Sequence, residues 1–114
     1  MFHKEITAIV STAREEDLQV SASLHTIEDV QGELYLHPGL VIGSRQPGEA
    51  KHINIMVSNI HTFVQVQFMS ANEEKTVSFQ ASPTWSPRVM REAIMEVIIN
   101  PYKEWILNGR LIEN

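Results

Sequence analysis

Hydrophobic and polar residues alternate with a period of two along the middle of this chain, in a stretch without charge. Residues 52–72 contain no Asp, Glu, Lys or Arg. The apolar positions of this stretch that recur at every second residue are Ile53, Ile55 and Val57, and then Val64, Val66 and Phe68. This alternation is typical of β-strands with one buried face, so we expect two strands here.

The opposite face of these two strands is neutral and able to form hydrogen bonds. Its residues are His52, Asn54, Ser58, Gln65 and Gln67, with Met56 and Phe63 among them. Exposed sheets often carry Lys or Glu, which discourage pairing with foreign strands. The absence of charge predicts that something covers this face. The alternative is a solvated face, since Gln and Ser are ordinary there.

The same alternation predicts how the strands pair. A turn at residues 59–62 places Val57 opposite Val64, Ile55 opposite Val66 and Ile53 opposite Phe68, which keeps one face apolar. A second turn at residues 71–74 predicts a third strand, with Phe68 opposite Val77 and Val66 opposite Phe79. Thr76, Ser78 and Gln80 then join the neutral face.

The N-terminal half is harder to assign. Residues 6–10 are predicted to form a strand, and residues 12–15 match a helix capping box. The alternation of Leu18, Val20, Ala22 and Leu24 with polar residues favours a strand, although a helix over residues 13–27 stays open. Further on we expect a turn at residues 31–32, a strand at 34–36, a turn at 37–39, a strand at 40–42 and a long loop at 43–51.

The C-terminal part predicts a helix. Ser86 is a suitable N-cap and Pro87 a suitable first helical residue, so the helix should extend to about Asn100. Its core-facing stripe is predicted to be Val89, Met90, Ala93, Ile94, Val97 and Ile98. Pro101 should break or bend the helix, and Gly109 should end a last amphipathic turn over residues 102–108. The elements together predict an α+β fold, an antiparallel β-sheet of five to seven strands with a C-terminal α-helix packed on one face.

Composition and charge limit the classes of function. The 114 residues suit a single domain, 1–114, of ordinary hydrophobic content, 43%. With 9 Lys+Arg against 14 Asp+Glu the net charge is −5, which argues against direct binding of nucleic acid. There is no cysteine, no signal-peptide pattern at the N-terminus and no apolar stretch of membrane-spanning length, so we expect a cytoplasmic protein without membrane contact.

No motif indicates catalysis. The five histidines are scattered, and no two have the spacing of a local metal site. The chain lacks a Gly-x-Ser-x-Gly elbow and a glycine-rich phosphate loop, and its adjacent carboxylates lie at expected turns. The sequence therefore suggests that the protein is not an enzyme and holds neither a cofactor nor a metal.

The remaining signals concern surfaces. The residues expected to bind a partner are Asn54, Gln65, Gln67, Gln80, Trp85, Met95 and Ile99. Trp85, between two prolines, is either a rigid interface anchor or a cap on the core. Met95 and Ile99 fall outside the core stripe of the helix, which predicts a homodimer unless the tail after Pro101 folds back and covers them with Tyr102, Trp105 and Ile106.

These signals favour a non-catalytic protein-interaction module that acts as a homodimer or on a protein partner. Small acidic chains without cysteine include inhibitors and accessory proteins of phages and mobile elements, and this likeness is one of general profile only. Secretion-type chaperones and structural components of assemblies share that profile. The other class is a small-ligand-binding or enzyme-like domain with His52, Asn54, Gln65 and Gln67 as the polar groups of a pocket.

Overall fold

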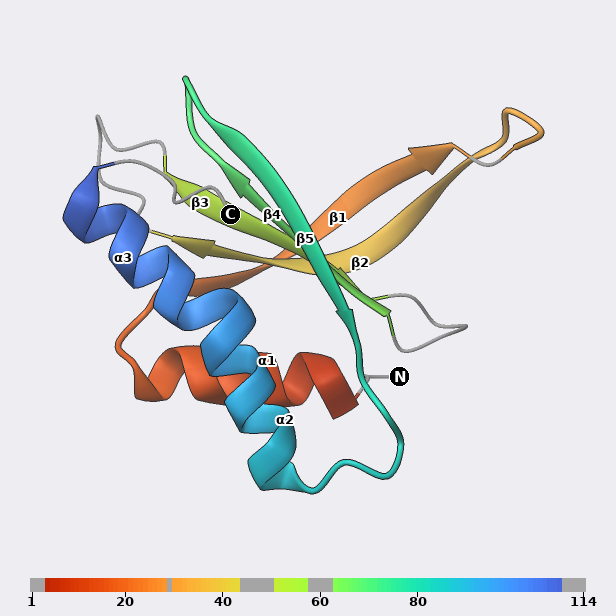
Figure 1. Ribbon diagram of the computed structural model, residues 1–114. Helices are drawn as coiled ribbons and strands as arrows, with labels where there is room; N and C mark the ends of the chain where they lie inside the picture. The colour runs from red at the N-terminus through yellow and green to blue at the C-terminus, as the bar shows by residue number, and fades with distance from the viewer. Residues whose placement is uncertain (1–3, 29, 44–50, 58–62, 110–114) are drawn as a thin grey trace.

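One antiparallel sheet and one layer of helices make up the fold (Figure 1). The structure, a computed structural model, describes residues 4–28, 30–43, 51–57 and 63–109. The sheet has the strand order β1-β2-β3-β4-β5. Its strands are β1 (Val20–Glu28), β2 (Leu34–Gly43), β3 (His52–Val57), β4 (Phe63–Met69) and β5 (Glu74–Gln80). The helices, α1 (Lys4–Glu15), α2 (Pro87–Ile94), the π-helix η1 (Met95–Ile99) and α3 (Asn100–Asn108), lie on the same side of the sheet, so the predicted α+β class is confirmed.

The predicted register of the central hairpin is confirmed. Ile53 pairs with Phe68, Ile55 with Val66 and Val57 with Val64. All of these side chains are at most 2% exposed and face the helices. A slip by one residue would turn them toward the opposite face, which explains why the hydrophobic pattern alone specifies the pairing. The expected turn at residues 59–62 lies outside the described residues.

The register predicted for the next hairpin is wrong by two residues. Phe68 pairs with Lys75 and Val66 with Val77. The cause is a tighter turn that starts at Ser70, whose Oγ accepts hydrogen bonds from the backbone N–H groups of Asn72 (3.3 Å) and Glu73 (3.1 Å). A shift of two residues leaves each side chain on its predicted face, so hydrophobicity alone could not reveal the error.

The predicted strand at residues 6–10 is a helix. In α1 the side chains of Ile6, Ile9 and Ala13 are buried on one face, a spacing of three and four residues. The match to a capping box at residues 12–15 is also wrong, because these residues are the end of α1. There Thr12 Oγ1 donates a hydrogen bond to the carbonyl of Ala8, one turn back, at 2.8 Å.

The link from α1 to the sheet follows the geometry of a Schellman motif. Asp17 has a left-handed backbone with φ 60°. Its N–H donates to the carbonyl of Arg14 at 3.1 Å, and the N–H of Leu18 donates to the carbonyl of Ala13 at 2.9 Å. Residues 13–27, for which the pattern allows both a helix and a strand, therefore contain parts of both: the helix ends at Glu15, and β1 begins at Val20.

Strand β2 is continuous, so the predicted turn at residues 37–39 is wrong. It pairs with β1 from Leu34 opposite Glu28 to Ile42 opposite Val20, and the link of residues 30–33 contains the predicted turn. Pro38 precedes Gly39, where pairing with β3 begins, so the missing N–H leaves no gap in that ladder. The far half of β1 and β2 forms a two-stranded ribbon that projects from the molecule (Figure 1). The predicted loop at 43–51 lies largely outside the described residues.

The start and the end of the C-terminal helical segment are confirmed. Ser86 Oγ accepts a hydrogen bond from the backbone N–H of Val89 at 3.2 Å, and Pro87 is the first helical residue. Gly109, with φ 77°, donates its N–H to the carbonyl of Trp105 at 2.9 Å. A glycine at this left-handed position avoids the steric cost of a Cβ atom.

Pro101 does not stop the helical segment, because a π-turn precedes it. The N–H of Asn100 bonds to the carbonyl of Met95, five residues back, and α3 then contains Pro101 in its first turn, where an N–H is not needed. The extra residue rotates the following side chains relative to the predicted stripe. Ile99 is therefore fully buried together with Ile98. Val89, also predicted to face the core, lies before the π-turn in the first turn of α2 and is 40% exposed.

The expectation that Met95 and Ile99 form an exposed pair is therefore wrong. Ile99 belongs to the core, and Met95 is half-buried against it. The alternative in which the tail folds back over this pair is not what the structure shows either. Tyr102 and Trp105 are buried in the core as part of the continuing helix, and Ile106 stays 40% exposed.

Candidate interaction surface on the open face of the sheet

The polar residues predicted on the central strands meet on the face of the sheet opposite the helices. We call it the open face; in the described residues of β3, β4 and β5 its central side chains are Asn54, Met56, Phe63, Gln65, Gln67, Thr76, Ser78 and Gln80. These side chains are half-buried or exposed, whereas their neighbours along β3 and β4 are buried. No helix of the described residues lies over this face (Figure 1).

The strand register arranges these residues in rows. One row runs from Asn54 through Gln67 to Thr76, and the next from Met56 through Gln65 to Ser78. Gln80 lies opposite Phe63 at the end of the same face. Directly opposed residues in an antiparallel sheet lie side by side, so three strands combine into one continuous surface.

Four of the seven predicted partner-binding residues lie on the open face: Asn54, Gln65, Gln67 and Gln80. The other three lie on the helix side. Trp85 is stacked on Phe79 with ring centroids 6.3 Å apart and an interplanar angle of 15°, and both rings pack against the core. The interpretation of Trp85 as a cap on the core fits this contact.

Three amides of the open face, those of Asn54, Gln65 and Gln67, have few strong partners within the described part of the chain. Asn54 Nδ2 donates to the sulfur of Met69 at 3.2 Å, and sulfur is a weak acceptor. Gln67 Nε2 donates to Glu74 Oε1 at 2.9 Å, near the end of the strands. Gln65, in the middle of the face, has no side-chain hydrogen bond with any described residue. These groups retain donors and acceptors for an external partner.

Apolar side chains interrupt the polar ones. Met56 is half-buried and Phe63 is 42% exposed, both on the open face. Methionine adapts its shape to different partners, and an exposed aromatic ring supplies contact area at low entropic cost. The mixture of amides, methionine and an aromatic ring resembles a protein-binding surface more than a surface for nucleic acid, which would need positive charge.

Two hollows of the described structure can be compared with the predicted small-molecule pocket at His52, Asn54, Gln65 and Gln67. One hollow of about 770 Å³ lies between α1 and β1, and another of about 450 Å³ lies between α1 and α2. None of the four residues lines either hollow. Within the described residues, no group of three or more His, Cys, Asp or Glu side chains is placed to hold a metal ion.

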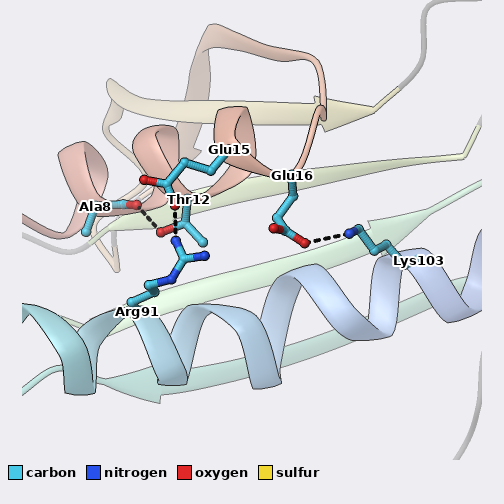
Figure 2. Close-up of polar contacts among 6 residues, drawn as sticks. All are labelled: Ala8, Thr12, Glu15, Glu16, Arg91 and Lys103. Atoms are coloured by element: carbon cyan, nitrogen blue, oxygen red, sulfur yellow. Dashed lines mark hydrogen bonds and ion pairs between the residues drawn. The ribbon is translucent and has the colours of Figure 1, made fainter.

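Two ion pairs, absent from the sequence-based predictions, join the end of α1 to the C-terminal helices (Figure 2). Arg91 of α2 pairs with Glu15, and Lys103 Nζ of α3 lies 2.6 Å from Glu16 Oε1. The hydrogen bond and the positive charge of Lys103 lower the pKa of Glu16 below its usual value. The cations are 76 and 87 residues from their acids, so no local spacing could indicate the pairs. The two pairs connect α1 and the residue after it with α2 and α3.

Comparisons of the chain with protein-family models, with curated proteins and with solved structures gave no match. In the described residues, no helix is both long enough and apolar enough to cross a bilayer.

Proposed function

We propose that this protein is a non-catalytic interaction module that binds a protein partner through the open face of its sheet. The observation that carries the proposal is a three-stranded surface of amides, hydroxyls, methionine and phenylalanine without a charged residue in its centre. No helix of the described chain covers it (Figure 1).

The lack of charge separates this surface from an ordinary solvated sheet. Lys and Glu are mostly exposed residues and are common on solvated surfaces, and the central rows of the open face contain neither of them. Burying charged groups against a partner costs desolvation energy, whereas neutral amides can exchange water for partner hydrogen bonds at little net cost. Interfaces are accordingly poor in charge at their centres.

The chemistry of the open face indicates what kind of surface a partner should have. A flat, neutral, hydrogen-bonding surface with Met56 and Phe63 fits a flat protein surface with its own amide and apolar groups. Inhibition of a host protein, as by phage or mobile-element accessory proteins, is the role we favour. A chaperone for secretion or a structural component of an assembly would use the same kind of face. We place this activity in the cytoplasm.

Site-specific photocrosslinking tests the proposal. A benzophenone side chain at Gln65 is in the middle of the open face, and the same group at Glu92, exposed on α2, is the matched control. In cells of the natural host, we expect a protein adduct of defined mass from position 65 and none from position 92. Met56→Lys should remove that adduct while leaving the thermal unfolding temperature close to that of the wild type.

Two results would overturn the proposal. One is the same set of adducts from both positions, which would mean that the open face has no preference. The other is a purified chain whose native mass spectrum contains a bound small molecule that is lost on mutation of Asn54 or Gln67. That result would support the ligand-binding alternative.

A further inference from the structure

The outer edge of β1 is a long strand edge that no other described strand covers. Within the described residues no strand pairs with this edge, and the nine residues of β1 carry neither Lys nor Pro and no charge before Glu28. Open edges of this kind are templates for another strand, and natural sheets usually block them with charge, proline or a bulge. The opposite edge, β5, begins with Glu74 and Lys75.

The ribbon of β1 and β2 exposes apolar side chains at its tip. Val30 is fully exposed, and Leu34 is 67% exposed. From Leu34 to Pro38, β2 pairs with β1 alone among the described strands, so this half of the ribbon has no third strand (Figure 1). A two-stranded ribbon is marginally stable by itself in water, which makes further support for this ribbon favourable.

A groove of about 770 Å³ lies beside the same strand, between α1 and β1. Its apolar lining is Ile6, Val10, Val20, Ala22 and Leu40. It is on the helix side of the sheet, and Leu34 shares that side because it lies an even number of residues from Leu40 and Ile42 on one strand. In the described residues, an exposed apolar tip and an apolar groove therefore lie next to the same strand edge.

We propose that β1 pairs antiparallel with β1 of a second copy of this chain, about a two-fold axis at Leu24. Leu24 is the midpoint of β1, so all nine residues pair, with Val20 opposite Glu28 of the other copy. Two five-stranded sheets then form one sheet of ten strands. Each ribbon tip comes to the start of β1 in the other copy, where the groove opens.

Strand geometry determines which residues of the two β1 strands can lie opposite each other. Directly opposed residues of an antiparallel pair point to the same face of the sheet. A two-fold axis perpendicular to the sheet keeps the helices of both copies on one face, so even-numbered residues of β1 must oppose even-numbered residues. Pairing about Leu24 obeys this rule, and the apolar positions Val20 and Ala22 stay on the groove side.

A second copy fits these features better than an unrelated peptide does. The same strand supplies both the open edge and an added strand with apolar residues at alternate positions, which is the self-complementarity that a two-fold dimer requires. One symmetry operation covers the edge, the tip and the groove together. No residue of the open face takes part, so this dimer and the proposed partner binding can fail independently.

Cysteine crosslinking tests the axis directly, because the chain contains no cysteine. At a two-fold axis, residue 24 opposes its own copy at the Cα distance of an antiparallel pair, which lies within the range of a disulfide. Leu24→Cys in the full chain should oxidise to a covalent dimer of twice 13.0 kDa. Leu107→Cys, at a position 83% exposed on α3, is the control and should stay monomeric.

Sedimentation equilibrium of the full chain tests the contact of the tip. The wild type should form dimers at high-micromolar concentration, and Val30→Lys/Leu34→Lys should raise the dissociation constant at least about tenfold. Leu107→Lys makes the same chemical change at another exposed position and should leave the constant nearly unchanged. Circular dichroism checks that each variant is folded.

A wild type that stays at 13.0 kDa throughout this range would overturn the dimer. So would equal crosslinking of Leu24→Cys and Leu107→Cys. If Leu107→Lys weakens a dimer that the tip variant leaves intact, dimerisation uses another surface, and the proposed axis is wrong. A monomer that carries a small molecule in the groove would equally refute the proposal.

Discussion

Replacement of Trp105 by alanine should destabilise the protein more than any other single change in α3. The Trp105 side chain is fully buried, and its ring meets Phe68 and Tyr102 edge to face, each at a centroid distance of 6.1 Å. Its Nε1–H donates to Glu73 Oε1 at 3.2 Å, and Lys51 Nζ lies 5.6 Å from the ring centroid. These contacts attach the helix beyond Pro101 to the sheet and to the β4–β5 turn.

The expected loss follows from burial. Truncation of a buried Trp to Ala typically costs about 3–5 kcal/mol, because apolar contact is lost and a cavity remains. A domain of this size has a free energy of unfolding of about 5–15 kcal/mol, so the variant should lose a large share of it. Trp105→Phe keeps most of the apolar volume and removes the N–H, and we expect a loss of about 1–2 kcal/mol.

Urea unfolding followed by far-ultraviolet circular dichroism measures these losses without depending on tryptophan fluorescence. Leu107→Ala is the control in the same helix, because Leu107 is 83% exposed and its truncation should cost about 0.5 kcal/mol or less. If Trp105→Ala costs no more than Leu107→Ala, then α3 is not docked on the sheet as described.

Two further predictions concern the sheet and the ion pairs. Val66→Asp should prevent folding, because Val66 is fully buried and an unpaired carboxylate would replace it; Gln67→Glu, on the open face beside Glu74, should cost at most about 1 kcal/mol. Equal melting temperatures for the two variants would contradict the register. Lys103→Met should lower the melting temperature at neutral pH. Since Lys103 lowers the pKa of Glu16 from 4.5, the stabilisation holds above pH 4.5 and is lost as the pH falls through the lowered pKa. A difference between wild type and Lys103→Met that is the same at acidic and neutral pH would refute the role of this pair.

The sequence by itself determined the elements whose local pattern allows one solution. The alternation from Ile53 to Phe68 specified a hairpin and its register, because a slip by one residue would expose the apolar side chains. Ser86 and Pro87 specified the start of a helix through the hydrogen bond of the cap and the fixed φ of proline. The same alternation placed the neutral residues of β3, β4 and β5 on one face of the sheet. Four of the seven predicted partner-binding residues therefore lie together on the open face.

Only the tertiary structure decided the elements whose local pattern allows two solutions. Ile6, Ile9 and Ala13 fit a helix face, while the apolar run at residues 6–10 also fits a buried strand, and packing on the sheet selected the helix. Likewise, the β4–β5 register depended on hydrogen bonds in the turn at Ser70. Hydrophobic alternation cannot reveal it, because a shift of two residues leaves every side chain on the same face.

The burial of Ile99 was decided in the same way. A regular helix would turn it toward Arg88 and Glu92, yet the π-turn before Pro101 adds a residue and rotates Ile99 into the core. The edge position of β1 follows from the strand order of the sheet, and the groove beside it exists only once α1 is packed on the sheet. Local patterns determine which face of an element is apolar, but which surfaces remain uncovered depends on how all the elements pack together.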